Sequence, residues 1–183
     1  HDALPILVLV STMTFAGAKI LDFDLSPAGT DNAVGLSPAN EVPAVTTSTG
    51  KGGAVSGGIT FDTDTSTLSF TMGYGSSAGF TNLTGAATGL HIHGPAAAGA
   101  ESAVLFNLAT LHFPSATPAT GGLIFGSIVY SPTQAAQLLA NQNYVNIHTT
   151  ANPDGEIRGQ LVRLNSAPEI AGPLDATVEC GVL

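Results

Sequence analysis

The amino-acid sequence predicts an all-β fold, an antiparallel β-sandwich or barrel with one short helix near residues 132–140. Short apolar segments recur along the 183-residue chain and are separated by turn residues, among them 22 glycines and 11 prolines. Several segments alternate apolar and polar side chains, which is the period of a half-buried strand. The length suits one domain better than two.

The first expected pair of strands is a hairpin over residues 52–74, in which GGAVSGGITFD and TLSFTMGY flank the polar turn DTDTS. The helix is expected directly after Ser131, because Pro132 suits the first helical position and Gln134 completes a capping box with the serine. Further strands are expected at GLHIHG, AVLFNL, GLIFGSIVY, YVNIHT and EIRGQLVR. His112 falls between these segments and is expected in a solvated loop.

Both ends of the chain are expected to lie outside the domain. Residues 1–18 are interpreted as a signal-peptide remnant, because the apolar run LVLVSTMTFAGA ends in small residues and is shorter than the roughly 20 residues that span a membrane. A buried first strand is the alternative. Residues 1–6, HDALPI, match a translated sequencing adapter, and we hypothesise that they are an artefact. Residues 164–183 are interpreted as a linker and the truncated start of an Ig-like domain, because APEI and ATVECG resemble the opening strands of such repeats.

Composition and motifs exclude several functions. The net charge of −9 comes from 13 acidic and 4 basic residues, and no Lys/Arg stripe is present that could bind nucleic acid. The single cysteine, Cys180, allows neither an internal disulfide nor a thiolate cluster. The sequence contains neither H-E-x-x-H nor a P-loop. We therefore expect a protein that is not an enzyme.

Three of the expected strands carry polar residues on one face. Because side chains alternate along a strand, one face of each strand is apolar and the other can form hydrogen bonds. If the three strands are neighbours in one sheet, their polar faces merge into one patch. The residues expected on it are His91 and His93; Tyr144, Asn146 and His148; and Glu156, Arg158 and Gln160.

Two interpretations of this polar patch remain open. In the first, Glu41, Asn146, Glu156 and Arg158 form a structural or ligand-binding network, in which Glu156 holds an imidazole and Arg158 pairs with Glu41 or Glu156. In the second, His91, His93 and His148 bind copper or zinc, because the two histidines of a His-x-His strand point the same way and a neighbouring strand can supply the third.

The segments LSPANEVPAV (36–45), GLHIHGPAAAG (89–99), AVLFNL (103–108) and YVNIHTTANPDGEIRGQL (144–161) occur in an order that resembles the chordin-type (CHRD) domain family. The resemblance extends over residues 19–163. It implies an all-β extracellular domain of the kind found in chordin and in secreted bacterial proteins. We therefore expect a secreted or surface-exposed bacterial module for adhesion or ligand binding, with an extracellular protein or glycan as its partner.

Overall fold

The computed structural model describes residues 19–116 and 121–164. The expected signal-peptide remnant and, beyond Leu164, the expected Ig-like segment lie outside the described residues. The strands are β1 (Ile20–Leu25), β2 (Gly52–Asp62), β3 (Thr67–Gly75), β4 (Ala87–His93), β5 (Val104–Asn107), β6 (His112–Pro114), β7 (Gly121–Val129), β8 (Asn143–Thr149) and β9 (Ile157–Arg163), and the α-helix is α1 (Pro132–Leu139).

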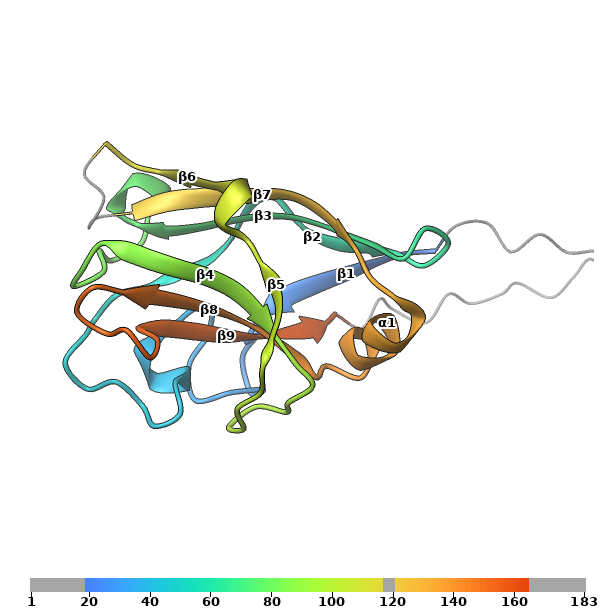
Figure 1. Ribbon diagram of the computed structural model, residues 1–183, viewed down its shortest axis with the longest axis horizontal. Helices are drawn as coiled ribbons and strands as arrows, with labels where there is room; N and C mark the ends of the chain where they lie inside the picture. The colour runs from blue at the N-terminus through green and yellow to red at the C-terminus, as the bar shows by residue number, and fades with distance from the viewer. Residues whose placement is uncertain (1–18, 117–120, 165–183) are drawn as a thin grey trace, which may run out of the picture.

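The nine strands of the described residues belong to one antiparallel sheet, in the order β5-β4-β8-β9-β1-β2-β3-β7-β6. The sheet curls into a half-barrel, so that β2, β3 and β7 lie over β4, β8 and β9 (Figure 1). The all-β prediction with one short helix is confirmed. Within the described ranges, no helix is long and apolar enough to cross a membrane.

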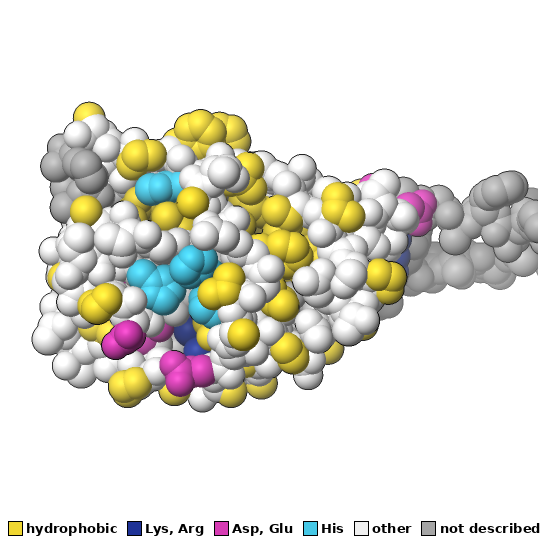
Figure 2. Space-filling model, viewed as in Figure 1, with side chains coloured by type: hydrophobic (Ala, Val, Ile, Leu, Met, Phe, Trp, Pro, Cys, Tyr) yellow, Lys and Arg dark blue, Asp and Glu magenta, His cyan; other side chains and the backbone are white. Residues whose placement is uncertain are grey.

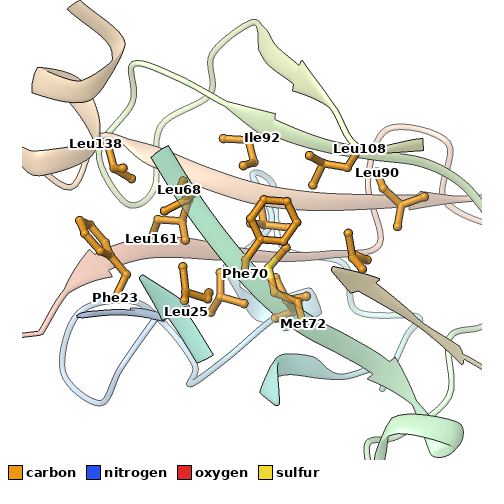
Figure 3. Close-up of a cluster of buried hydrophobic side chains, with 14 of the residues drawn as sticks. Phe23, Leu25, Leu68, Phe70, Met72, Leu90, Ile92, Leu108, Leu138 and Leu161 are labelled. Atoms are coloured by element: carbon orange, nitrogen blue, oxygen red, sulfur yellow. The ribbon is translucent and has the colours of Figure 1, made fainter. Parts of the chain in front are cut away.

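The hydrophobic core lies between the two halves of the curled sheet (Figure 3). Burial of a large apolar side chain contributes about 1.5–3 kcal/mol, which fixes the face that each strand turns inward. Because β4, β8 and β9 turn their apolar side chains inward, their polar side chains point away from the core. The core residues labelled in the figure are Phe23, Leu25, Leu68, Phe70, Met72, Leu90, Ile92, Leu108, Leu138 and Leu161, all buried.

The expected hairpin and helix are both present. β2 and β3 pair across the polar turn, with a bulge between Ala54 and Ile59. Helix α1 begins with the predicted capping box, in which the Gln134 amide donates to the Ser131 hydroxyl at 3.3 Å and the Gln134 side chain accepts from the Ser131 amide at 2.9 Å. The buried Leu138 anchors α1 to the core at one end of the half-barrel.

Two strands were not predicted, and one prediction about a histidine was wrong. β1 and β6 were missed. β6 has only three residues, which is too short to show any alternation. His112 begins β6 and is half-buried, and its Nε2 lies 2.8 Å from the hydroxyl of Tyr74. The hydroxyl of the buried Tyr74 requires a partner, so His112 has a structural contact rather than a solvated position.

Candidate metal centre

The polar faces of β4, β8 and β9 merge into one patch because the three strands are neighbours in the sheet. His91 lies opposite Asn146, His93 opposite Tyr144, and Asn146 opposite Arg158. Figure 2 shows histidine side chains gathered at the middle of this face, with acidic side chains beside them. The alternation in the sequence therefore predicted which residues of β4 and β8 share this face, whereas Glu156, which was expected on it, lies before β9 and has other partners.

Three histidines in this patch bring their rings together. One ring nitrogen each of His91, His93 and His148 lies within 4.8 Å of the other two. The ring centroids are 5.5 Å apart for His91 and His93, 5.0 Å for His91 and His148, and 6.1 Å for His93 and His148. The structure thus assembles the three histidines that the sequence proposed as metal ligands.

Backbone carbonyls orient two of the rings. His93 Nδ1 lies 2.9 Å from the carbonyl of Ser102, and His148 Nδ1 lies 2.9 Å from the carbonyl of Pro153. A carbonyl can only accept, so each Nδ1 carries the proton and each neutral ring keeps a lone pair on Nε2. Both Nε2 atoms are buried and have no hydrogen-bond partner among the described residues. This is the arrangement that metal-binding histidines commonly use.

A glycine makes room for the third ring. Nδ1 of His91 is also buried and is unpaired within the described part of the chain. Gly89 lies opposite His148, and a Cβ atom built on Gly89 would lie 3.0 Å from Cε1 of His91 and 3.4 Å from Cδ2 of His148. A side chain at position 89 would therefore crowd both rings.

The surroundings favour neutral imidazoles. Burial lowers the pKa of His91, and His148 and His93 lower it further by charge repulsion. Burial also lowers the pKa of His93, and outweighs the hydrogen bond to Ser102 that raises it. The neutral imidazole is the form that binds a metal ion, so these two rings are in the required state at neutral pH.

Glu156, which was expected to hold an imidazole, has other partners. Its carboxylate accepts hydrogen bonds from the Ser48 hydroxyl at 2.7 Å, the Thr84 amide at 2.7 Å and the Thr84 hydroxyl at 2.8 Å. It also accepts from the Thr149 hydroxyl at 2.6 Å and the Asn152 side chain at 3.1 Å. The prediction that Glu156 holds an imidazole was wrong. Glu156 lies before β9 rather than in it, and the loops at this end of the sheet surround its carboxylate.

Glu41 contacts the histidine patch through Asn146, whose Nδ2 donates to Glu41 Oε2 at 3.3 Å. Burial raises the pKa of Glu41 to about 7, against the opposing charge of Arg158 and the hydrogen bond from Asn146. Glu41 and Asn146 were both predicted as members of a polar network, and the structure brings them together. Glu156 lies in a separate network.

A family model for the CHRD domain matches residues 33–161, well over half of the chain. The chain belongs to the CHRD family. No curated protein and no solved structure matches it significantly. The matched region of the CHRD domain contains the three histidines, Glu41 and Glu156. β1 precedes that region, yet it pairs with β2 and β9 in the same sheet.

Arg158 in this CHRD domain fixes a loop rather than forming the expected ion pair with Glu41 or Glu156. Its guanidinium lies 3.5 Å above the ring of Tyr144, and its Nη2 donates to the carbonyl of Ala100 at 2.7 Å. The Tyr144 ring also stacks on His93, with centroids 4.9 Å apart and an interplanar angle of 7°. Tyr144 and Arg158 therefore support His93 and the loop that carries its Ser102 acceptor.

A cavity of about 320 Å³ lies beside Glu41. Val42, Pro43 and Pro153 contribute apolar walls, and Gly155 lies in the same lining. Pro153 is also the residue whose carbonyl orients His148. The cavity and the histidine cluster therefore share one loop.

Residues 75–79 match G-x-S-x-G, the nucleophile pattern of many serine hydrolases, which was missed in the sequence. In the structure, Ser77 lies in a short 3-10 helix over Ser76–Ala78. Ser77 borders Gly121, whereas His112 borders Gly122, and adjacent residues of a strand point to opposite faces. His112 is moreover bonded to Tyr74. The arrangement pairs no histidine base with Ser77 among the described residues.

Proposed function

We propose that this CHRD domain is a non-enzymatic module that binds one copper or zinc ion through His91, His93 and His148. One observation carries the proposal. One ring nitrogen from each of the three histidines lies within 4.8 Å of the other two, and backbone carbonyls orient the rings of His93 and His148. Each ring also has a buried nitrogen without a partner among the described residues, which costs free energy that a bound metal ion would reduce.

The ligand set suits these two metals. Imidazole nitrogens bind zinc and copper well, at about 2.0–2.1 Å, which places tetrahedral ligand atoms about 3.4 Å apart. Because the histidine nitrogens lie up to 4.8 Å apart, the rings would move toward one another by about 1 Å on binding. Rotation of half-buried side chains such as His91 and His148 can supply such a shift.

We also propose that the domain acts outside the cell, secreted or on the cell surface. The support is the likeness of its motifs to extracellular CHRD domains and the signal-peptide pattern in its sequence. An ion held by three neutral imidazoles needs no thiolate, so the proposed site would tolerate an oxidising environment.

The test is the metal content of the full chain, purified without chelators and compared with His93→Ala and His112→Ala. His112→Ala is the matched control, because it removes a half-buried histidine far from the cluster in the sheet order. We expect about one equivalent of zinc or copper in the wild type and in His112→Ala, and its loss in His93→Ala, as measured by inductively coupled plasma mass spectrometry.

A wild-type protein that stays metal-free after incubation with Zn²⁺ or Cu²⁺ would refute the proposal. Full metal content in His93→Ala would refute the assignment of the ligands. Thermal melts of the metal-free proteins show whether each variant is folded before its metal content is compared.

A second candidate function is recognition of an extracellular protein or glycan, and the cavity beside Glu41 is the observation that favours it. Ala44 is an exposed residue in the cavity lining, so Ala44→Arg would fill the cavity without disturbing the core. Binding to glycan or peptide arrays that Ala44→Arg abolishes, at unchanged metal content, would support this function. Arrays without any bound member would reject it.

A further inference from the structure

Three histidines supply three of the four ligands of a tetrahedral metal site. The fourth position decides what the site does, because structural sites fill it with a protein atom, whereas reactive sites leave it to water or substrate. The following inference rests on the proposed function and concerns this fourth ligand.

His91 has an asparagine directly opposite it on each neighbouring strand, Asn107 on β5 and Asn146 on β8. Residues paired in this way point to the same face, with Cβ atoms about 5 Å apart. Both asparagines are therefore placed to reach an ion beside His91. They differ in what their side-chain oxygens already do.

The oxygen of Asn107 is in use. Asn107 is exposed, and its Oδ1 accepts a hydrogen bond of 2.9 Å from the amide of Ala109. This bond closes the turn that follows β5. Asn107 has therefore a local structural role.

The oxygen of Asn146 is free. Asn146 is only 5% exposed, and its Oδ1 is buried without a hydrogen-bond partner in the described structure. Its Nδ2 donates to Glu41 Oε2 at 3.3 Å. The ionised form of Glu41 can only accept, so beside a bound cation it takes the NH₂ group of the amide and leaves Oδ1 for another partner.

The space and the charges around Asn146 fit the same role. A Cβ atom on Gly155 would lie 2.8 Å from Nδ2 and 2.9 Å from Oδ1 of Asn146, so the glycine leaves room for the amide. Arg158 lies opposite Asn146 on β9 and would repel a cation. The negative charges of Glu41 and Glu101 offset that positive charge, because Glu41 interacts with Arg158 and Glu101 interacts with both Glu41 and His93.

We propose that Oδ1 of Asn146 is the fourth metal ligand and that Glu41 is the positioning residue that orients it. The resulting site has three nitrogens and one oxygen, all from the protein. Such a closed site retains an ion and offers no position to a substrate. The oxygen ligand also favours divalent zinc or copper over the softer Cu(I) ion.

The test uses Co²⁺ as a spectroscopic substitute for zinc in the full chain, with Asn146→Ala compared with Asn107→Ala. We expect wild type and Asn107→Ala to give an intense tetrahedral visible spectrum that azide does not change. Asn146→Ala should have an open position, so its spectrum should shift with azide, and its Zn²⁺ affinity in calorimetry should fall about 10- to 100-fold.

An azide-sensitive spectrum of the wild-type protein would overturn the inference while leaving the histidine site intact. Unchanged Zn²⁺ affinity in Asn146→Ala would overturn it as well. The wild-type azide titration does not depend on the folding of any variant. Failure of the proposed function is distinguishable, because the wild-type protein would then bind neither Co²⁺ nor Zn²⁺.

Discussion

Glu156 and Glu41 are two buried carboxylates near the same end of the sheet, and their surroundings shift their pKa values in opposite directions. Burial alone would raise the pKa of Glu156, but hydrogen bonds from Thr149, Ser48 and Thr84 lower it below its usual value. Glu41 accepts one side-chain hydrogen bond, and burial raises its pKa to about 7. Several donors keep the Glu156 carboxylate ionised, whereas burial with only one side-chain donor favours the protonated form of Glu41.

This difference in pKa indicates that Glu156 stabilises the fold, whereas Glu41 belongs to the candidate site. Glu156 joins three segments of the chain, around Ser48, around Thr84 and over residues 149–156, so its charge stabilises the fold. Glu41 keeps a buried oxygen, Oε1, without a partner among the residues that the structure describes. Burial disfavours the ionised form of such an acid, a cation bound nearby would favour it, and acids with a raised pKa occur at functional sites.

The largest effect is expected from Glu156→Ala. The substitution removes the common acceptor of four side chains, which are the hydroxyls of Ser48, Thr84 and Thr149 and the side-chain NH₂ group of Asn152. We expect a loss of about 3–5 kcal/mol in the free energy of unfolding at pH 7, measured by urea denaturation. Asp154→Ala, at an exposed position of the same loop, is the control. A loss below 1 kcal/mol would mean that the Glu156 network does not stabilise the fold.

Glu41→Gln should stabilise the metal-free protein, and the effect should depend on pH. The folded-state pKa of Glu41 is raised from 4.5 to about 7, so the folded protein binds the proton more tightly than the unfolded chain. Wild-type stability therefore falls as the pH rises from 4.5 to 7, whereas glutamine does not titrate.

The gain from Glu41→Gln should be close to zero at pH 4 and reach about 3 kcal/mol at pH 8, since one pKa unit corresponds to about 1.4 kcal/mol. Denaturation of both proteins in EDTA at the two pH values measures it. Asp64→Asn, at an exposed position in the turn between β2 and β3, is the control. Parallel stability profiles of wild type and Glu41→Gln would contradict the raised pKa.

The sequence predicted the clustering of the three histidines better than the partners of either carboxylate. The parity of a strand is fixed by its apolar residues, so the burial of Leu90 and Ile92 forces His91 and His93 onto the other face. The same argument applies to Val145 and Ile147 in β8. Short-range alternation was sufficient, once the order of the strands brought β4 and β8 together.

The partners of Glu156 could not be predicted in this way. Ser48 lies 108 positions before Glu156 and Thr84 lies 72 positions before it, and both are in segments without regular alternation. The path of such loops depends on the curl of the sheet. The role of Gly89 was equally hidden, because a glycine in a strand shows its purpose only when the two rings beside it are placed.

Thr149→Val should have the next largest effect. The change keeps the shape of the side chain but removes a hydroxyl that donates to Glu156 at 2.6 Å and accepts from the Asn152 amide at 3.0 Å. We expect a loss of about 2 kcal/mol at pH 7. Because the pKa of Glu156 is lowered in the folded state, its stabilising effect exists above pH 4.5 and is lost as the pH falls. The loss should therefore shrink at acid pH in denaturation curves, and Thr150→Val is the exposed control. An equal loss at pH 3 would show that the hydroxyl acts independently of the Glu156 charge.

Ser48→Ala should have the smallest effect of the four. Ser48 also makes two hydrogen bonds, to Glu156 at 2.7 Å and from the Gly50 amide at 3.0 Å, so bond counting alone would equate it with Thr149. Ser48 is 9% exposed, however, whereas Thr149 is fully buried. Water can replace the missing hydroxyl at position 48 more readily, and we expect a loss of about 1 kcal/mol in urea denaturation, with Thr49→Ala as the control. A loss as large as that of Thr149→Val would mean that the number of hydrogen bonds a hydroxyl makes, and not its access to water, sets its contribution to stability.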